Sequence, residues 1–311
     1  MKGAGAIFRF LLDRRSAGER VALVTITAVT GSSSRSPGTH MAVSETGLFV
    51  GSFSGGCVEA AVVAEACRVI ASGRTERVRF GAGSRYIDIR LPCGGGVDLL
   101  IVPDPSEQIL RTAADQLASR KPIALALSFD GTLSLQPVGL DGGDRWSNEV
   151  FIVRHDPELR LVIAGHGAEP RSLARLGSSY GADIVVLSPD AELVSAMLAE
   201  GHGAHILKTP GRSSHLRGDP WTSVVLLFHD HDWEADLLAQ ALDSPAFFVG
   251  AMGSRRTHAR RLEALAEIGV PPAARDRLVA PLGLIPAARD PDTLALSALA
   301  QIVGAQGHQP A

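Results

Sequence analysis

The chain has 311 residues, a formal net charge of -3, and 45% hydrophobic, 20% charged and 5% aromatic residues. This composition is typical of a globular protein large enough for two domains, each with its own core. The small negative charge, the few aromatic side chains and the lack of a basic block argue against nucleic acid as a partner.

Cysteine use and the first residues indicate the compartment. Three cysteines are few and odd in number, which favours a reducing environment over a disulfide framework. The first apolar run is broken by Arg9 and by charged residues 13–15, and no run approaches the roughly 18 residues of a membrane span. We therefore expect a cytoplasmic protein with no membrane partner.

Residues 1–120 form the first expected domain. Short β-branched runs with few helices between them predict a mixed α+β fold without regular βαβ alternation. Helices are expected at residues 4–14, 58–72 and 106–119, and strands at residues 20–29, 39–44, 47–53, 76–80, 86–91 and 97–102.

Residues 51–59 read Gly-Ser-Phe-Ser-Gly-Gly-Cys-Val-Glu and lead into the second of these helices. If Ser54 is the N-cap, Cys57 lies in the first helical turn, where the helix dipole favours a thiolate. Gly55 and Gly56 let a ligand approach the backbone closely. The segment therefore predicts a reactive sulfur beside anion-accepting N–H groups, and the alternative is a small buried side chain beside a turn.

A second cysteine lies in a similar setting. Cys93 precedes Gly94 and Gly95, between two expected strands. Two thiols that each adjoin a run of glycines suggest one site for a sulfur-seeking or metal-bearing ligand. Cys67, by contrast, lies in the middle of an expected helix and is assigned to the core.

The hydroxyl-rich loop at residues 30–38 contains one cation, Arg35. Its backbone N–H groups and the Arg35 guanidinium could bind a phosphate or carboxylate, and the alternative is a solvated connection. Residues 121–157 follow the first domain. They alternate like a hairpin around a central Asp-Gly and are interpreted as an edge hairpin and linker.

Residues 158–311 show regular alternation of strands and helices, which predicts a Rossmann-like, doubly wound parallel sheet. The protein is thus expected to be α/β overall, with the mixed domain first. Strands are expected at residues 161–164, 184–187, 204–207, 223–228 and 246–250, and helices at residues 170–180, 191–200, 232–242, 255–268 and 291–303.

The first turn of this domain is compared with the dinucleotide pattern G-x-G-x-x-G/A. Gly165 and Ala168 fill the second and third positions, while Ile163 stands at the first. The acidic residue expected after the second strand is also displaced, because residues 188–189 are Ser-Pro and Asp190 comes late. The pattern favours the fold over NAD(P) binding. The candidate contacts in this turn are Gly165, His166 and Gly167.

Two further strand ends are polar. His229 and His231 would face the same side of a strand, but no third ligand has metal spacing, and Asp232 is equally suited to cap the next helix. We therefore interpret this end as facing a polar ligand and assign no metal site. At the start of a later helix, Arg255 follows Gly-Ser and could bind an anion, while the alternative is simple N-capping by Ser254.

Taken in order, the motifs GSSSRSPG, GSFSGGCVEAA, LPCGGG, a Gly-His turn, FHDH and VGAMGSRRTHARRL resemble the XdhC/CoxI family of xanthine dehydrogenase accessory factors. The likeness covers roughly residues 20–105 and 158–303. It implies that the chain assists an enzyme instead of catalysing a reaction. Such proteins bind the molybdenum cofactor, support its sulfuration with sulfur from a cysteine desulfurase, and deliver it to an apo molybdenum hydroxylase.

The handover of a large cofactor also favours a homodimer, by family likeness. The alternative function is an NAD(P)-dependent oxidoreductase, which needs a nucleotide in the glycine turn of the second domain. Cys57 and Cys93 are the first candidates for the cofactor. The remaining predicted contacts are Gly55, Gly56, Gly94, Gly95, Arg35, Gly165, His166, Gly167 and Arg255.

Overall fold

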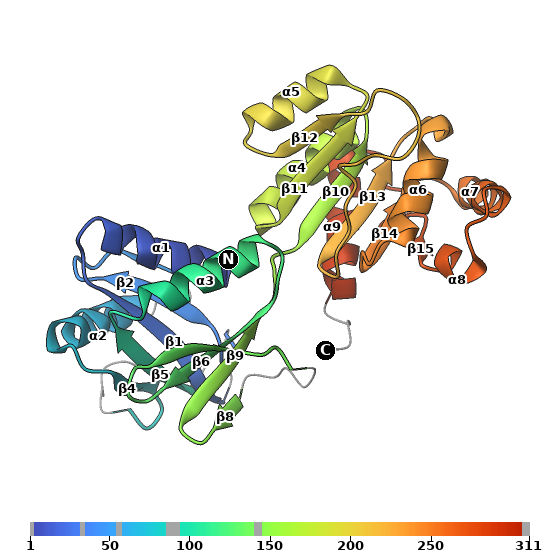
Figure 1. Cartoon of the computed structure of the whole chain (residues 1–311). Coiled ribbons are helices and arrows are strands. Elements are labelled where there is room, and N and C mark those ends of the chain that lie inside the picture. The colour runs from blue at the N-terminus through green and yellow to red at the C-terminus, as the bar shows by residue number, and fades with distance from the viewer. Residues whose placement is uncertain (1–2, 32–34, 54–57, 85–93, 140–144, 307–311) are drawn as a thin grey trace. The chain divides into compact units, whose positions relative to one another are not determined.

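The computed structural model describes residues 3–31, 35–53, 58–84, 94–139 and 145–306 (Figure 1). The chain divides into two compact units, Met1–Pro157 and Glu158–Pro310, and each is described by itself. Among the described residues, no helix combines the length and the apolar character needed to cross a bilayer.

The first unit contains an antiparallel sheet with strand order β3-β2-β1-β5-β4. Helix α2 packs on one face, and helices α1 and α3 lie side by side on the other (Figure 1). The strands are β1 (Val21–Thr30), β2 (His40–Ser44), β3 (Phe49–Val50), β4 (Glu76–Gly81) and β5 (Gly96–Pro103), and the helices are α1 (Ala4–Ser16), α2 (Glu59–Ser72) and α3 (Glu107–Ala118).

Strand β1 shows why this sheet has two cores. Its side chains point alternately to the two faces, and both faces are apolar. Val24 and Ile26 join the cluster under α2, whereas Val21 and Leu23 join the cluster under α1 and α3. All four side chains are fully buried, so the strand is covered on both sides.

Residues that follow α3 form a second antiparallel sheet with strand order β7-β6-β9-β8. Leu125 and Phe151 of this sheet belong to the same core cluster as α1 and α3. The region that the sequence suggests as an edge hairpin and linker therefore contributes to the core of the first unit. Its strands are β6 (Ile123–Ser128), β7 (Leu133–Gln136), β8 (Arg145–Ser147) and β9 (Val150–His155).

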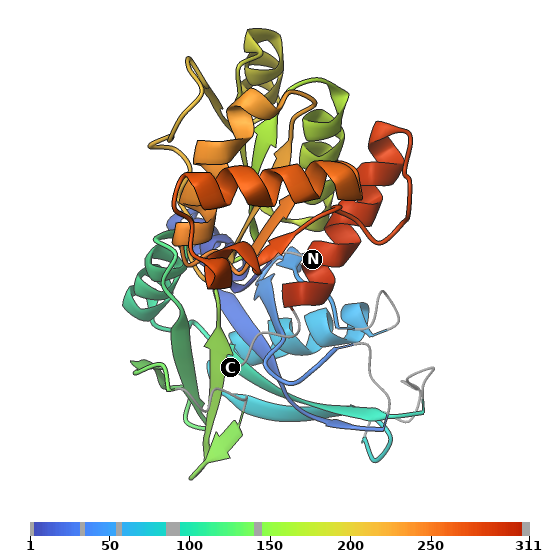
Figure 2. The same cartoon turned by 90° about the vertical axis from the view of Figure 1, so that its right-hand side faces the viewer.

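The second unit contains a parallel sheet with strand order β12-β11-β10-β13-β14-β15, which confirms the predicted doubly wound fold. Helices α4, α5 and α9 pack on one face and α6 and α7 on the other (Figure 2). The strands are β10 (Arg160–Gly165), β11 (Asp183–Ser188), β12 (Gly203–Ile206), β13 (Thr222–Leu227), β14 (Phe248–Ala251) and β15 (Leu278–Val279). The helices are α4 (Ala168–Tyr180), α5 (Ala191–Ala199), α6 (Glu234–Asp243), α7 (Arg255–Glu267), α8 (Pro272–Arg275) and α9 (Pro291–Gln306).

Two predicted N-cap residues are wrong. Helix α2 has Val58 at its N-cap, not Ser54, because the helix begins only at Glu59. Helix α6 follows a short 3-10 turn (His231–Trp233) and has Trp233 at its N-cap, not Asp232. The strand expected at residues 86–91 lies outside the described residues.

Candidate functional site

Two candidate segments of the first unit start from one end of its large sheet. Strands β1 and β4 finish at this end and β5 begins there, because each neighbouring pair is antiparallel. The short strand β3 points toward the same end but stops at Val50, level with Leu23 of β1. Thr30 and Gly81 both pair with Gly96. The loop after β1 and the segment before β5 therefore leave the sheet at the same end, and β3 points toward it.

Glu59 joins the chain before and after the Gly-Gly-Cys sequence. Its carboxylate Oε1 accepts hydrogen bonds from Ser52 Oγ at 2.7 Å and from Phe53 N at 2.9 Å. Oε2 accepts from Val58 N at 3.3 Å. Glu59 is only 6% exposed, so these bonds satisfy a carboxylate that is removed from water. The flanks of the segment are thereby held to a single side chain.

Arg35 has a structural contact of its own. Its Nε donates a hydrogen bond at 3.0 Å to the carbonyl oxygen of Ser52, so it fixes the segment that precedes Gly-Gly-Cys. At the other end of the same loop, a Cβ on Gly31 would lie 3.2 Å from Gly95 Cα. Residues 31 and 35 are at most about 14 Å apart along an extended chain. The loop after β1 thus contacts the flanks of both cysteine segments.

Arg79, for which the sequence predicts no role, organises the neighbouring strand ends. It donates to Asp98 Oδ2 at 2.8 Å, to Thr30 Oγ1 at 3.0 Å and to the Ala82 carbonyl at 2.7 Å. A Cβ on Gly96 would lie 2.8 Å from Arg79 Nη2, so only glycine fits there without a shift. A single basic residue at this register of β4 is a weak signal in the sequence, which explains the omission.

Only some of the predicted cofactor residues of this unit are among the described residues. Cys57, Cys93, Gly55 and Gly56 lie outside the described residues. Gly94 is exposed with φ +68° and Gly95 is buried. Cys67 is half-buried on α2 and its Sγ donates to the Ser44 carbonyl at 3.6 Å, which fits the structural assignment made from the sequence.

In the second unit, the glycine turn starts two residues later than the sequence alignment suggests. Gly165 is the last residue of β10, and Gly167, with φ +85°, is the N-cap of α4. The pattern therefore begins at Gly165 and places Pro170, not Ala168, at its third position. A Cβ on Gly165 would lie 2.5 Å from Leu227 O, so the close approach of β10 and β13 requires this glycine.

Three polar side chains lie at the carboxyl ends of β10 and β13, where doubly wound sheets bind ligands. The rings of His166 and His229 are 5.9 Å apart, and His166 contacts Phe228 edge to face. His229 Nε2 lies 3.3 Å from Glu169 Oε1. Sequence reasoning missed Glu169, although its place two residues after the second glycine of the turn is a usable signal.

The strand end at His229 differs from the sequence-based expectation. Strand β13 ends at Leu227, so His229 follows the strand and is not part of it. Across the side chains that the structure describes, no three His, Cys, Asp or Glu residues form a group suited to a metal ion. Arg255 is exposed at the first position of α7, and Ser254 caps this helix by accepting from Thr257 N at 3.1 Å.

The comparison with known proteins agrees with this architecture. The XdhC and CoxI family model matches residues 14–81, and the XdhC Rossmann domain model matches residues 161–302. The molybdenum cofactor insertion chaperone PaoD of Escherichia coli (strain K12) is 35% identical over 304 residues, which cover 97% of this chain and 89% of PaoD. The chain belongs to the XdhC and CoxI family.

Other similar proteins include one from Bacillus subtilis (strain 168) that is named as part of a probable xanthine dehydrogenase. It is 23% identical over 92% of this chain and 93% of that protein. A crystal structure described as a xanthine dehydrogenase from Bacillus halodurans has a TM-score of 0.79 at 22% identity. It covers 99% of this chain and 97% of its own, so the fold of this XdhC and CoxI family member is shared along the whole chain.

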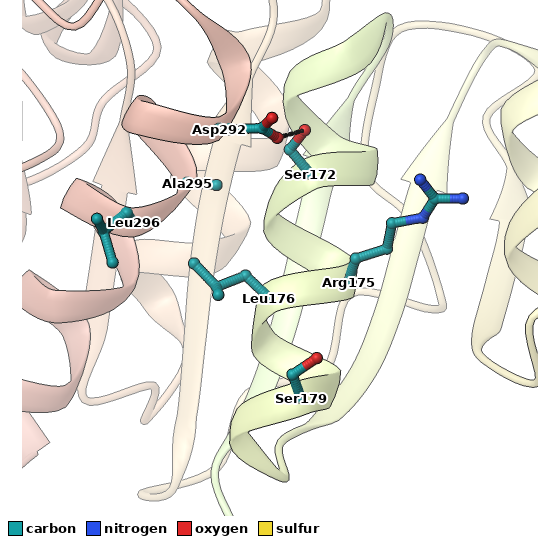
Figure 3. A pocket seen from close by; sticks show the side chains of 7 residues that line it. All are labelled: Ser172, Arg175, Leu176, Ser179, Asp292, Ala295 and Leu296. Carbon is teal, nitrogen blue, oxygen red and sulfur yellow. Dashed lines mark hydrogen bonds between the residues drawn. The ribbon is translucent and has the colours of Figure 1, made fainter.

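This family member also has a pocket of about 400 Å³ between α4 and α9 (Figure 3). Ser172 donates to Asp292 Oδ1 at 2.7 Å across it, and Leu176 and Leu296 supply apolar walls. Arg175 extends away from α9 and binds Glu200 at 2.9 Å. The pocket is lined by residues other than the predicted cofactor contacts.

Proposed function

We propose that this chain binds the molybdenum cofactor, supports its sulfuration and delivers it to an apo hydroxylase of the xanthine dehydrogenase type. The observation that carries the proposal is its 35% identity, over 97% of the chain, with a protein named a molybdenum cofactor insertion chaperone. The cofactor is cargo in this role, so the chain assists and does not catalyse the client's reaction.

The chemistry of the first unit supports this role. The cofactor contains a dithiolene sulfur pair, a phosphate and a flat pterin ring. Cys57 and Cys93 offer soft thiolates, which suit molybdenum or a transferable sulfur. Gly55, Gly56 and Gly94 add no side chain that would block a ligand near the backbone. The loop after β1 contacts the flanks of both cysteine segments, with Gly31 beside Gly95 and Arg35 bonded to the Ser52 carbonyl, which favours a shared site.

The geometry changes the role proposed for Arg35. Its Nε is engaged with the Ser52 carbonyl, so Arg35 acts first by positioning the segment before Cys57. The buried carboxylate of Glu59 accepts a hydrogen bond from the hydroxyl group of the same Ser52. Together they set where the cysteine segment starts and ends, before any cofactor binds.

The second unit contributes predicted contacts of a different kind. His166 is partly exposed after Gly165 and Gly167, and Arg255 is exposed at the start of α7. We assign the exposed Arg255 guanidinium to an anionic group of the cofactor or of the client enzyme. A cysteine desulfurase as sulfur donor, a homodimeric state and a cytoplasmic location complete the proposal.

The test is anaerobic purification from a host that makes molybdopterin, followed by fluorescence of the oxidised pterin. Wild-type protein is expected to retain the pterin, and Cys57→Ala and Cys93→Ala to lose most of it. Cys67→Ala is the matched control, because this third thiol lies on α2 and contacts the Ser44 carbonyl. Equal retention by all four proteins would overturn the roles of both cysteines, and no pterin on wild type would overturn the function.

A further inference from the structure

A Rossmann turn holds the pyrophosphate of a dinucleotide at the N-terminus of its first helix. The free N–H groups and the positive end of the helix dipole attract the anion there. In this chain that helix is α4, which has 13 residues, and its N-cap Gly167 makes no side-chain capping bond. By fold alone, this turn is where NAD(P) is expected to bind.

The chain's own Glu169 lies at this position. It is the second residue of α4, and its side chain is 19% exposed. Its Oε2 lies 3.4 Å from where a Cβ on Gly167 would stand, so the carboxylate is folded back over the turn. Its Oε1 lies 3.3 Å from His229 Nε2, on the loop after β13. The negative charge thus lies between two strand ends that a bound pyrophosphate would contact.

A second feature of the site also departs from dinucleotide binding. In dinucleotide-binding folds an acidic side chain near the end of the second strand binds a ribose hydroxyl. The acidic side chain near the end of β11 is Asp190, and it binds backbone N–H groups of its own chain instead. Asp190 Oδ1 accepts from Glu192 N at 2.9 Å and from Leu193 N at 3.2 Å, so it caps α5. The last residue of β11 is Ser188, which is buried.

We propose that Glu169 is a specificity-determining residue that occupies the anion position of this turn and excludes dinucleotides from it. A like charge held within the site is a repulsive element that a pyrophosphate cannot neutralise. The residues present therefore do not fit NAD(P) at its usual position. This exclusion takes place in the second unit and does not depend on whether the first unit binds a pterin.

The test is calorimetric titration of the full chain with ADP-ribose and with NADH. Wild type is expected to bind neither at millimolar concentration, and Glu169→Gln and Glu169→Ala to gain affinity at least about tenfold, which is about 1.4 kcal/mol. Glu169→Gln preserves the shape of the side chain, so it separates charge from packing. Thermal melting of each variant verifies that it is folded.

Glu192→Ala is the matched control. Glu192 also lies at the second position of a helix, but its helix N-terminus is already capped by Asp190. This variant should behave like wild type with both ligands. Micromolar binding of either ligand to wild type would overturn the proposal. So would folded Glu169 variants that gain no affinity, because the exclusion would then have another cause.

Discussion

The Nε2 atoms of His40 and His155 lie 2.8 Å apart and share a hydrogen bond between the two β-sheets of the first unit. His40 belongs to β2 and His155 ends β9. The Nδ1 of His40 bonds Thr25 Oγ1 at 2.8 Å, and the ring of Phe8 contacts both imidazoles. Because one ring must accept the proton that the other donates, the pair holds together only while at least one histidine is neutral.

This pair predicts an acid-sensitive first unit. Desolvation lowers the pKa of His155 to about 4, and desolvation together with the charge of His155 lowers the pKa of His40 well below its usual value. Unfolded histidines titrate near pH 6.5, so from there down to about pH 4 the unfolded chain binds more protons. Stability is therefore complete above pH 6.5 and falls as the pH falls. The expected slope is at most about 1.4 kcal/mol per pH unit for each histidine.

Urea unfolding between pH 5 and pH 8 measures this slope. His155→Gln should flatten it, because one titrating group is removed. His202→Gln in the second unit is the control for the loss of a histidine outside the pair. A His155→Gln profile that is as steep as that of wild type would contradict the role of the pair.

Glu59 is expected to stabilise the segment around Ser52 and Phe53. Glu59→Ala leaves the buried Phe53 N–H without its acceptor, which costs about 1–3 kcal/mol. Glu65→Ala on the same helix removes an ion pair with the half-exposed Arg68, which is worth at most about 1 kcal/mol. Chemical denaturation compares the two, and limited proteolysis should cut Glu59→Ala faster near residues 51–53. An equal loss of unfolding free energy in both variants would contradict the stabilising role of the Glu59 hydrogen bonds.

Gly165 is expected to tolerate no side chain. In Gly165→Ala the new methyl group would meet the backbone oxygen of Leu227 at 2.5 Å, so β10 and β13 must separate. Overpacking of this kind costs about 1–3 kcal/mol or more. Gly304→Ala is the control, because its Cβ meets nothing within 4 Å and alanine favours a helix by up to about 1 kcal/mol. Thermal melting should move in opposite directions for the two variants, and a shared direction would refute the packing argument.

The ion pair between Arg261 and Glu234 connects α7 to α6 in the second unit. It is bidentate, at 2.7 Å and 3.1 Å, and both side chains are buried. Glu234→Ala leaves a buried guanidinium without its carboxylate, which is expected to cost about 3–5 kcal/mol. The exposed pair Arg111 and Glu107 is the comparison, and its removal should cost less than about 1 kcal/mol.

A second variant separates charge from packing at this pair. Glu234→Leu combined with Arg261→Met should recover much of the stability that Glu234→Ala loses, because no charge remains buried. Urea unfolding of the single and double variants tests this. A double variant that is less stable than Glu234→Ala would show that packing, and not the unpaired charge, dominates.

Local patterns predicted most of the elements. Apolar, β-branched runs indicated β1 and β5, and helical spacing indicated α1. Helix starts were less predictable, because they depend on contacts beyond the local pattern. At α2, the carboxylate of Glu59 turns back to Ser52 and Phe53, so the helix begins at Glu59.

The glycine turn of the second unit shows the same limit. The sequence can be aligned with the dinucleotide pattern in two ways, two residues apart. The end of β10 at Gly165 decides between these alignments. The position of Glu169 over the turn could not be predicted from the sequence either, because Glu169 contacts His229, which is 60 positions away in the chain.

Periodicity and motifs are local properties of the chain, and they were enough to predict the two-part architecture, the family and the candidate cofactor residues. The folded arrangement was needed to show which segments leave the same end of the first sheet and which side chains hold them. Antiparallel pairing of β1 with β5 brings Thr30 opposite Gly96, and such registers depend on contacts between residues far apart in the chain.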